Sequence, residues 1–316
     1  MADPVRVDVH MHLYPSTESG DWWKAGYEIW EYGEKDGVRF SRSSGTVGDA
    51  LAAMAETGFS HGVAVNLLSV DLFREEALAM LPEDLHGEDR AKAVTEIDAT
   101  MADRFRAANR WLVDALAPIR QLTPYVGVDP WALSPNQNVE HLREMADRGA
   151  RGIKLHPVAQ RFEPNDPRMR PVYDACEELG LVVLSHTGSA RGGEPFAEPH
   201  AFAEVLARHP RLTVVLAHLG GGSWRQTLGL ARAFPEVTFD LCEIVEWTGA
   251  PNAPTDEDLA RMIREIGPER VMLGTDFPWY DLDRTVELVM DLPVLSTEEK
   301  EQILGANAIG RLDLQV

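Results

Sequence analysis

Ionisable residues in this sequence gather at the ends of short apolar segments. The first such segment, VRVDVHMH, ends in two histidines, and later segments end in KLH, SH, AH, CE and TD. The side chains concerned are His10, His12, Lys154, His156, His186, His218, Glu243 and Asp276. Imidazole and carboxylate groups bind divalent transition metals and are also common proton carriers in enzymes. These residue types therefore predict a metal-dependent active site.

The spacing of the first two histidines strengthens this prediction. His10 and His12 are two residues apart, and side chains at i and i+2 of a strand lie on the same face. A single histidine at a strand end is more often structural, so it is the joint pattern that favours a metal. We predict that His10, His12, His186 and Asp276 hold a divalent ion. Zinc is the expected metal, manganese and iron are the alternatives, and one or two ions are considered.

The remaining polar residues have several interpretations. We expect His218 to act on the proton of an activated water, with Asp276 as an alternative base. Lys154 could bind a substrate carboxylate, pair with an acid or, if carbamylated by CO₂, bridge two metals. A second metal site could consist of Lys154, His156 and Glu243. Glu243 could equally be a proton shuttle or a solvated group at the rim.

Short segments of strand character recur along the chain and alternate with helical stretches. Predicted strands cover 5–10, 61–67, 123–129, 151–156, 181–186, 212–218, 237–243 and 270–276. Predicted helices cover 46–57, 140–148, 168–179, 199–208, 224–233 and 256–266. Such alternation predicts an α/β fold with parallel strands. Eight units in 316 residues predict a (β/α)₈ TIM barrel, in which the strand ends meet at one rim. No GxGxxG motif follows the first strand, which disfavours an open dinucleotide-binding sheet.

Residues 1–316 are expected to form a single barrel domain with two insertions over the C-terminal mouth. Residues 14–45 follow the first strand and form a predicted lid on an apolar pocket, or else a satellite core under a long loop. The aromatic residues of this insertion are Trp22, Trp23, Tyr27, Trp30, Tyr32 and Phe40. Residues 68–118 follow the second strand and form a helical insertion, with a long helix at about 91–116.

Charge and composition restrict the partners of this protein. Lysine and arginine number 30 and aspartate and glutamate number 51, which gives a net charge of −21. Such an acidic chain disfavours nucleic acids and anionic membranes as partners. The two cysteines predict no disulfide framework. With no predicted signal peptide or membrane span, we expect a cytoplasmic protein that acts on a small molecule.

The strand-end motifs resemble those of the amidohydrolase superfamily. The motifs occur in the order of the superfamily across about residues 5–312; they are HMHLYP, GIKLHP, VLSHTGS, VVLAHLGGG and MLGTDFPW. They most resemble the amidohydrolase-2 branch, which is related to aminocarboxymuconate semialdehyde decarboxylase. The resemblance implies that His10 and His12 are the HxH metal ligands and that His186 and Asp276 are the ligands from strands 5 and 8. It implies that His218 polarises or deprotonates water.

The expected activity is metal-dependent hydrolysis of an amide, ester or lactone bond in a small, possibly aromatic, organic molecule. His218 or Asp276 would take the proton of water, and Lys154 would help to stabilise the oxyanion. One alternative is non-oxidative decarboxylation of an unsaturated or aromatic acid, although the basic residue expected near strand 2 has no clear match. Further alternatives are a dinuclear iron or manganese oxygenase and a metal-free subunit or binding protein. The family resemblance also implies a homodimer as one assembly to test.

Overall fold

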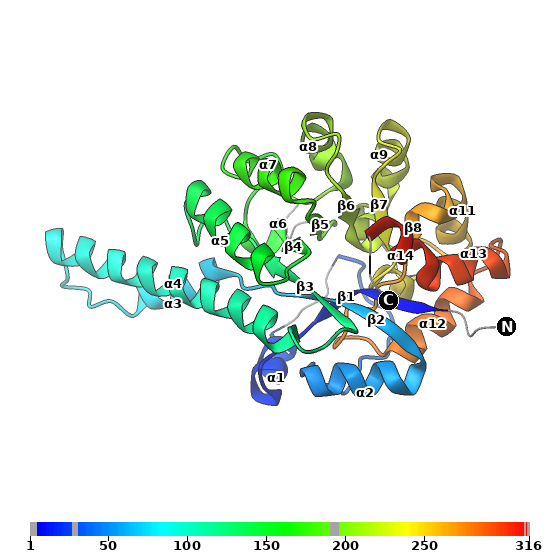
Figure 1. Cartoon of the computed structure of the whole chain (residues 1–316), viewed down its shortest axis with the longest axis horizontal. Helices are drawn as coiled ribbons and strands as arrows, with labels where there is room; N and C mark the ends of the chain where they lie inside the picture. The colour runs from blue at the N-terminus through cyan, green and yellow to red at the C-terminus, as the bar shows by residue number, and fades with distance from the viewer. Residues whose placement is uncertain (1–4, 27–30, 190–195, 313, 315–316) are drawn as a thin grey trace.

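The eight predicted strands form one parallel sheet. The structure, a computed structural model, describes residues 5–26, 31–189, 196–312 and 314. Each strand pairs in parallel with the next along the chain, in the order β1 to β8 (Figure 1). The strands are β1 (Arg6–His12), β2 (Phe59–Val65), β3 (Leu122–Gly127), β4 (Gly152–Leu155), β5 (Val182–Ser185), β6 (Val214–Leu216), β7 (Thr238–Asp240) and β8 (Val271–Met272).

The segment that follows β8 closes the sheet onto β1. The N–H of Val9 donates to the carbonyl of Leu273 at 2.9 Å, and the N–H of Asp276 donates to the carbonyl of His10 at 3.0 Å. These bonds complete the ring of strands, so the predicted (β/α)₈ barrel is confirmed. The last strand is shorter than predicted: the N–H of Leu273 already bonds the carbonyl of Ile303 outside the sheet, and the chain reaches a left-handed conformation at Asp276, where φ is 60°.

Helices cover the outside of the barrel (Figure 1). They include α2 (Val47–Thr57), α5 (Pro135–Asp147), α7 (Arg170–Leu179), α8 (Ala203–Arg208), α9 (Thr227–Ala233), α11 (Asp256–Ile266), α12 (Leu282–Asp291), α13 (Thr297–Glu301) and α14 (Asn307–Leu312). Capping residues explain several boundaries. Thr46 caps α2 with its side chain, and α5 begins five residues before its predicted start because Ser134 forms a capping box with Gln137. Gly58 ends α2 in the left-handed conformation, as its position predicts.

Both insertions contain helices. α1 (Thr17–Ala25) lies in the first insertion, of which Tyr27 and Trp30 lie outside the described residues. α3 (Val70–Ala79) and α4 (Gly87–Leu116) lie in the second insertion and form a pair that extends away from the barrel (Figure 1). α4 includes the predicted long helix and begins four residues earlier. Among the described residues, none of the helices has the length and apolar character that crossing a membrane requires.

Candidate metal and catalytic site

Three buried side chains, two from β1 and one from the segment after β8, form a compact cluster. Nε2 of His12 lies 3.2 Å from Oδ1 of Asp276, and Nε2 of His10 lies 3.6 Å from the same oxygen. The ligand atoms of the three residues all lie within 4.8 Å of one another, and each residue is at most 7% exposed. Strand parity turns both histidines to one side, and closure of the barrel brings Asp276 to them.

Three more histidines line the same mouth. The rings of His156 and His186 are stacked, with centroids 3.9 Å apart and an interplanar angle of 9°. The ring of His186 lies 4.7 Å from that of His218, which in turn lies 5.5 Å from that of His10. Both His186 and His218 therefore border the compact cluster, whereas His156 faces it across His186.

Burial sets the protonation states of this site. It lowers the pKa of His10, His12 and His186, so these imidazoles favour the neutral form that can bind a cation. Burial also opposes ionisation of Asp276, but its hydrogen bond with His12 and the nearby imidazoles hold the pKa of this carboxyl well below its usual range. Neutral imidazoles beside an ionised carboxylate are a donor set that fits a divalent ion.

Lys154 lies at the centre of the cluster. Its Nζ is 2.6 Å from Nε2 of His10, and the side chain is 1% exposed. Burial lowers the pKa of this lysine, while Asp276 is the largest opposing influence. The amine of Lys154 therefore lies within reach of any substrate that approaches His10.

His218 is held in a fixed orientation by three acceptors. Its backbone N–H donates to Oδ1 of Asp240 at 2.9 Å. Its Nδ1 lies 3.1 Å from the carbonyl oxygen of Cys242 and 3.3 Å from Oε2 of Glu243. Because Nδ1 is engaged by these oxygens, Nε2 is the ring nitrogen left for chemistry in the cavity.

Two buried aspartates support the predicted ligands and were not predicted from the sequence. Oδ2 of Asp240 lies 3.1 Å from Nδ1 of His10. Oδ1 of Asp8 accepts the backbone N–H of His10 at 2.9 Å and that of Thr275 at 3.1 Å, and burial raises the pKa of Asp8 to about 7. The available signal was a carboxylate inside an otherwise apolar strand, as in VRVDVH and VTFDLCE. Such carboxylates orient the ligands of a metal.

The cluster opens into a cavity of about 430 Å³. Seven of the eight residues predicted from the sequence line it, and Glu243 is the exception. The apolar wall includes Tyr14 from the segment after β1, Trp22 and Trp23 from α1, and Trp279 from the segment after β8. The rings of Trp279 and His12 are nearly perpendicular, with centroids 5.0 Å apart. A polar floor under aromatic walls suits a small planar molecule with an acidic substituent.

Known proteins resemble this chain in sequence and in fold. It is 26% identical to 2-amino-3-carboxymuconate-6-semialdehyde decarboxylase of Dictyostelium discoideum over 65% of this chain and 66% of that protein. It is 27% identical to 4-sulfomuconolactone hydrolase of Hydrogenophaga intermedia over 55% of this chain and 61% of that protein. The match thus spans less than two thirds of either relative.

A solved structure has the same fold. It is that of a dihydroxybenzoic acid decarboxylase from Polaromonas sp. JS666 with bound manganese and the inhibitor 2-nitroresorcinol. It has 13% sequence identity to this chain and a TM-score of 0.66, and the match covers 98% of this chain and 97% of that one. A family model described as amidohydrolase matches residues 7–312, which include all of the barrel strands except the first residue of β1. This protein therefore belongs to the amidohydrolase-2 family.

Proposed function

We propose that this protein is a metal-dependent enzyme that removes CO₂ non-oxidatively from an unsaturated or aromatic carboxylic acid. The observation that carries this proposal is the aromatic-walled cavity in which Lys154 lies beside His10, His12 and Asp276. The sequence alone favours hydrolysis. The decarboxylase of Dictyostelium discoideum favours the alternative, because its match covers 65% of this chain whereas that of the lactone hydrolase covers 55%.

His10, His12 and Asp276 would hold the divalent ion, with His186 beside them as a further ligand. Zinc remains the expected ion, with manganese or iron as alternatives. When bound, such an ion supplies positive charge that polarises the oxygen atoms of a substrate. Each of these side chains is at most 9% exposed.

The other residues bind the acid and manage one proton. Lys154 attracts the carboxylate or an adjacent oxygen, and Trp23 and Trp279 contact the planar part of the molecule. The bond between the carboxyl carbon and its neighbour breaks, CO₂ leaves, and the electron pair stays on the neighbouring carbon. Because the oxygens of Cys242 and Glu243 face Nδ1 of His218, the neutral ring carries its proton there, and Nε2 carries one only in the imidazolium form. That imidazolium would give its Nε2 proton to the carbon and be left neutral.

Hydrolysis of a lactone is the second candidate, because the chain is also 27% identical to 4-sulfomuconolactone hydrolase. In that case His218 would take a proton from water instead of giving one to carbon. We do not propose a dinuclear oxygenase. Within the described residues, both groups of side chains spaced for a metal ion contain His10, and neither contains His156 or Glu243.

The test measures metal content and products together. The purified enzyme, loaded in turn with zinc, manganese or iron, is incubated with unsaturated and aromatic acids carrying a ¹³C-labelled carboxyl group. We expect labelled CO₂. His12→Ala and Asp276→Ala should lose both the metal and CO₂ release, whereas the exposed control His86→Ala should keep both. A hydrolysis product without CO₂ would favour the second candidate, and full activity in a metal-depleted variant would contradict both.

A further inference from the structure

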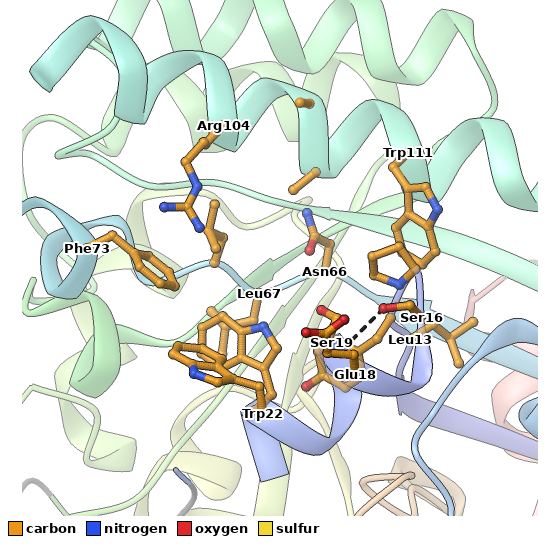
Figure 2. A pocket seen from close by; sticks show the side chains of 16 residues that line it. Leu13, Ser16, Glu18, Ser19, Trp22, Asn66, Leu67, Phe73, Arg104 and Trp111 are labelled. Atoms are coloured by element: carbon orange, nitrogen blue, oxygen red, sulfur yellow. Dashed lines mark hydrogen bonds between the residues drawn. The ribbon is translucent and has the colours of Figure 1, made fainter. Parts of the chain in front are cut away.

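A second cavity lies beside the first and outside the metal cluster. Its volume is about 520 Å³, and it is a partly open space lined by the segment from Leu13 through α1, the loop after β2, and α4 (Figure 2). Tyr14, Trp22, Trp23 and Leu67 border both cavities. The two spaces therefore share a largely aromatic wall, and none of the predicted metal ligands reaches the outer one.

Stacked aromatic rings form one side of this outer cavity. The rings of Trp22 and Phe73 are stacked, with centroids 5.6 Å apart and an interplanar angle of 23°. Trp23 meets Trp22 edge-on at 5.0 Å. Trp111 projects from α4 into the space at some distance from Trp22 (Figure 2). Walls of this kind favour a planar ring as ligand, since flat surfaces bury a ring on its faces.

Arg104 supplies a positive charge at this wall. Its Cζ lies 4.2 Å from the centroid of the Phe73 ring. Neighbouring arginines on the two insertion helices are paired, Arg74 with Asp98 and Arg106 with Asp103. Among the described residues, the structure gives Arg104 no carboxylate partner.

The stacking of Arg104 leaves its hydrogen-bond donors available. A guanidinium group that lies on a ring uses its face, while its N–H groups point outward in its own plane. Those donors match the two oxygens of a carboxylate. In a chain with a net charge of −21, a guanidinium without a carboxylate partner also offsets the repulsion that an anionic ligand meets.

The opposite end of the cavity is polar and acidic. Ser16, Glu18 and Ser19 lie there, away from Arg104 (Figure 2). Oγ of Ser16 is engaged by the backbone N–H of Ser19 at 3.2 Å. The Glu18 carboxylate repels an anion and can accept a hydrogen bond from a hydroxyl group. The cavity is therefore polarised, with its cation at one end and its acceptor at the other.

We propose that this outer cavity is a second binding site for a hydroxylated aromatic carboxylic acid. The carboxylate binds Arg104, the ring lies against Trp22, and a hydroxyl group faces Glu18. This inference deepens the proposed function and rests on it, because the same class of acid is the expected substrate. The site holds that acid one aromatic wall away from the metal cluster.

The experiment uses 2-hydroxybenzoate as probe and isothermal titration calorimetry on the metal-loaded enzyme. We expect Arg104→Gln to weaken binding at one site by about tenfold or more, since a charge-assisted bidentate contact is lost. Arg106→Gln, on the same helix and paired with Asp103, should bind the probe like the unmodified enzyme. The uncharged analogue 2-hydroxybenzamide should show no dependence on Arg104.

The position of the ligand is checked by anomalous diffraction from 5-bromo-2-hydroxybenzoate. Bromine in the outer cavity, together with the Arg104 dependence, supports the proposal. Bromine in the inner cavity alone, or equal affinity of Arg104→Gln and the unmodified enzyme, overturns it. Binding in the outer cavity does not require turnover. If the protein binds the probe there in a manner that depends on Arg104 but releases no CO₂ from any acid, only the proposed function is refuted.

Discussion

At the scale of single residues, the most constrained side chain of the site is His218. It adopts a positive φ of 62°, which a non-glycine residue rarely takes. The N–H bond to Asp240 and the oxygens around Nδ1 compensate for this conformation. Glu243 also has a positive φ, of 64°, and places its carboxylate 3.3 Å from that ring nitrogen. We interpret Glu243 as a group that orients His218, not as a ligand of a second metal.

Replacing this carboxylate separates the two interpretations. Glu243→Gln should lower kcat about 10- to 100-fold, the usual effect of removing a group that orients a functional histidine. Metal content should stay unchanged, because the ligand cluster is intact. Steady-state kinetics and metal analysis on the same sample measure both quantities, with the exposed Glu236→Gln as control. Loss of metal would place Glu243 among the ligands, and an unchanged kcat would remove it from the site.

Much of the site follows from the sequence because strand parity and barrel closure act on every strand alike. They bring His10, His12 and Asp276 together although 264 or more residues separate the aspartate from the two histidines. Supporting contacts do not follow in the same way. Asp8 and Asp240 stand out in the sequence only as carboxylates within apolar strands, and only the three-dimensional structure shows that each accepts the backbone N–H of a predicted functional histidine.

At the scale of elements, the segment after β6 places His218. This segment, η3 (Ala217–Gln226), contains consecutive left-handed residues at His218, Leu219, Gly220 and Gly221. The sequence predicts a strand ending at 218 and a helix from 224, but not this path between them. Leucine disfavours positive φ, so the sequence signals this path mainly at Gly220 and Gly221 and does not show where it begins. Contacts from elsewhere in the chain, including the Glu31 carboxylate that accepts the Gly222 N–H at 3.0 Å, hold the turn.

Adding a methyl group at Gly221 tests how closely the neighbouring atoms pack against this turn. At Gly221, φ is 52° and ψ is −135°, and an added Cβ would lie 2.7 Å from Oε1 of Glu31 and 2.9 Å from the carbonyl oxygen of Thr187. Gly221→Ala should lower the free energy of unfolding by about 1–3 kcal/mol. Gly229→Ala, in α9 with nothing within 4 Å of the added atom, should raise it by roughly 0.5–1 kcal/mol. Urea unfolding measures both, and equal stabilities of the two variants would contradict the prediction.

At the scale of the whole molecule, buried carboxyl groups couple stability to pH. Burial raises the pKa of Glu31 and Glu246 to about 7 and that of Asp129 to about 6. These groups lie in the first insertion, after β3 and after β7, so the effect is spread around the barrel. Each binds a proton more tightly in the folded chain than in the unfolded chain. The contribution of these groups to the free energy of unfolding is therefore greatest at acid pH and falls as they ionise. Repulsion among the charges of a chain with net charge −21 also lowers stability as pH rises.

Glu246 offers the clearest test of this coupling. It accepts a hydrogen bond from Oγ1 of Thr285 at 2.9 Å and is 4% exposed. Its pKa rises from 4.5 to about 7 on folding, so between these values the folded chain binds more protons than the unfolded one. The contribution of this group to the free energy of unfolding is full below pH 4.5 and declines by roughly 3 kcal/mol as pH rises to 7.

A glutamine at this position keeps an acceptor for Thr285 and carries no charge at any pH. Glu246→Gln should therefore match the unmodified protein near pH 4 and exceed its stability above pH 7, as measured by urea unfolding across this range. The exposed control Glu257→Gln should follow the unmodified curve; if Glu246→Gln follows it too, burial of Glu246 is not a source of the pH dependence.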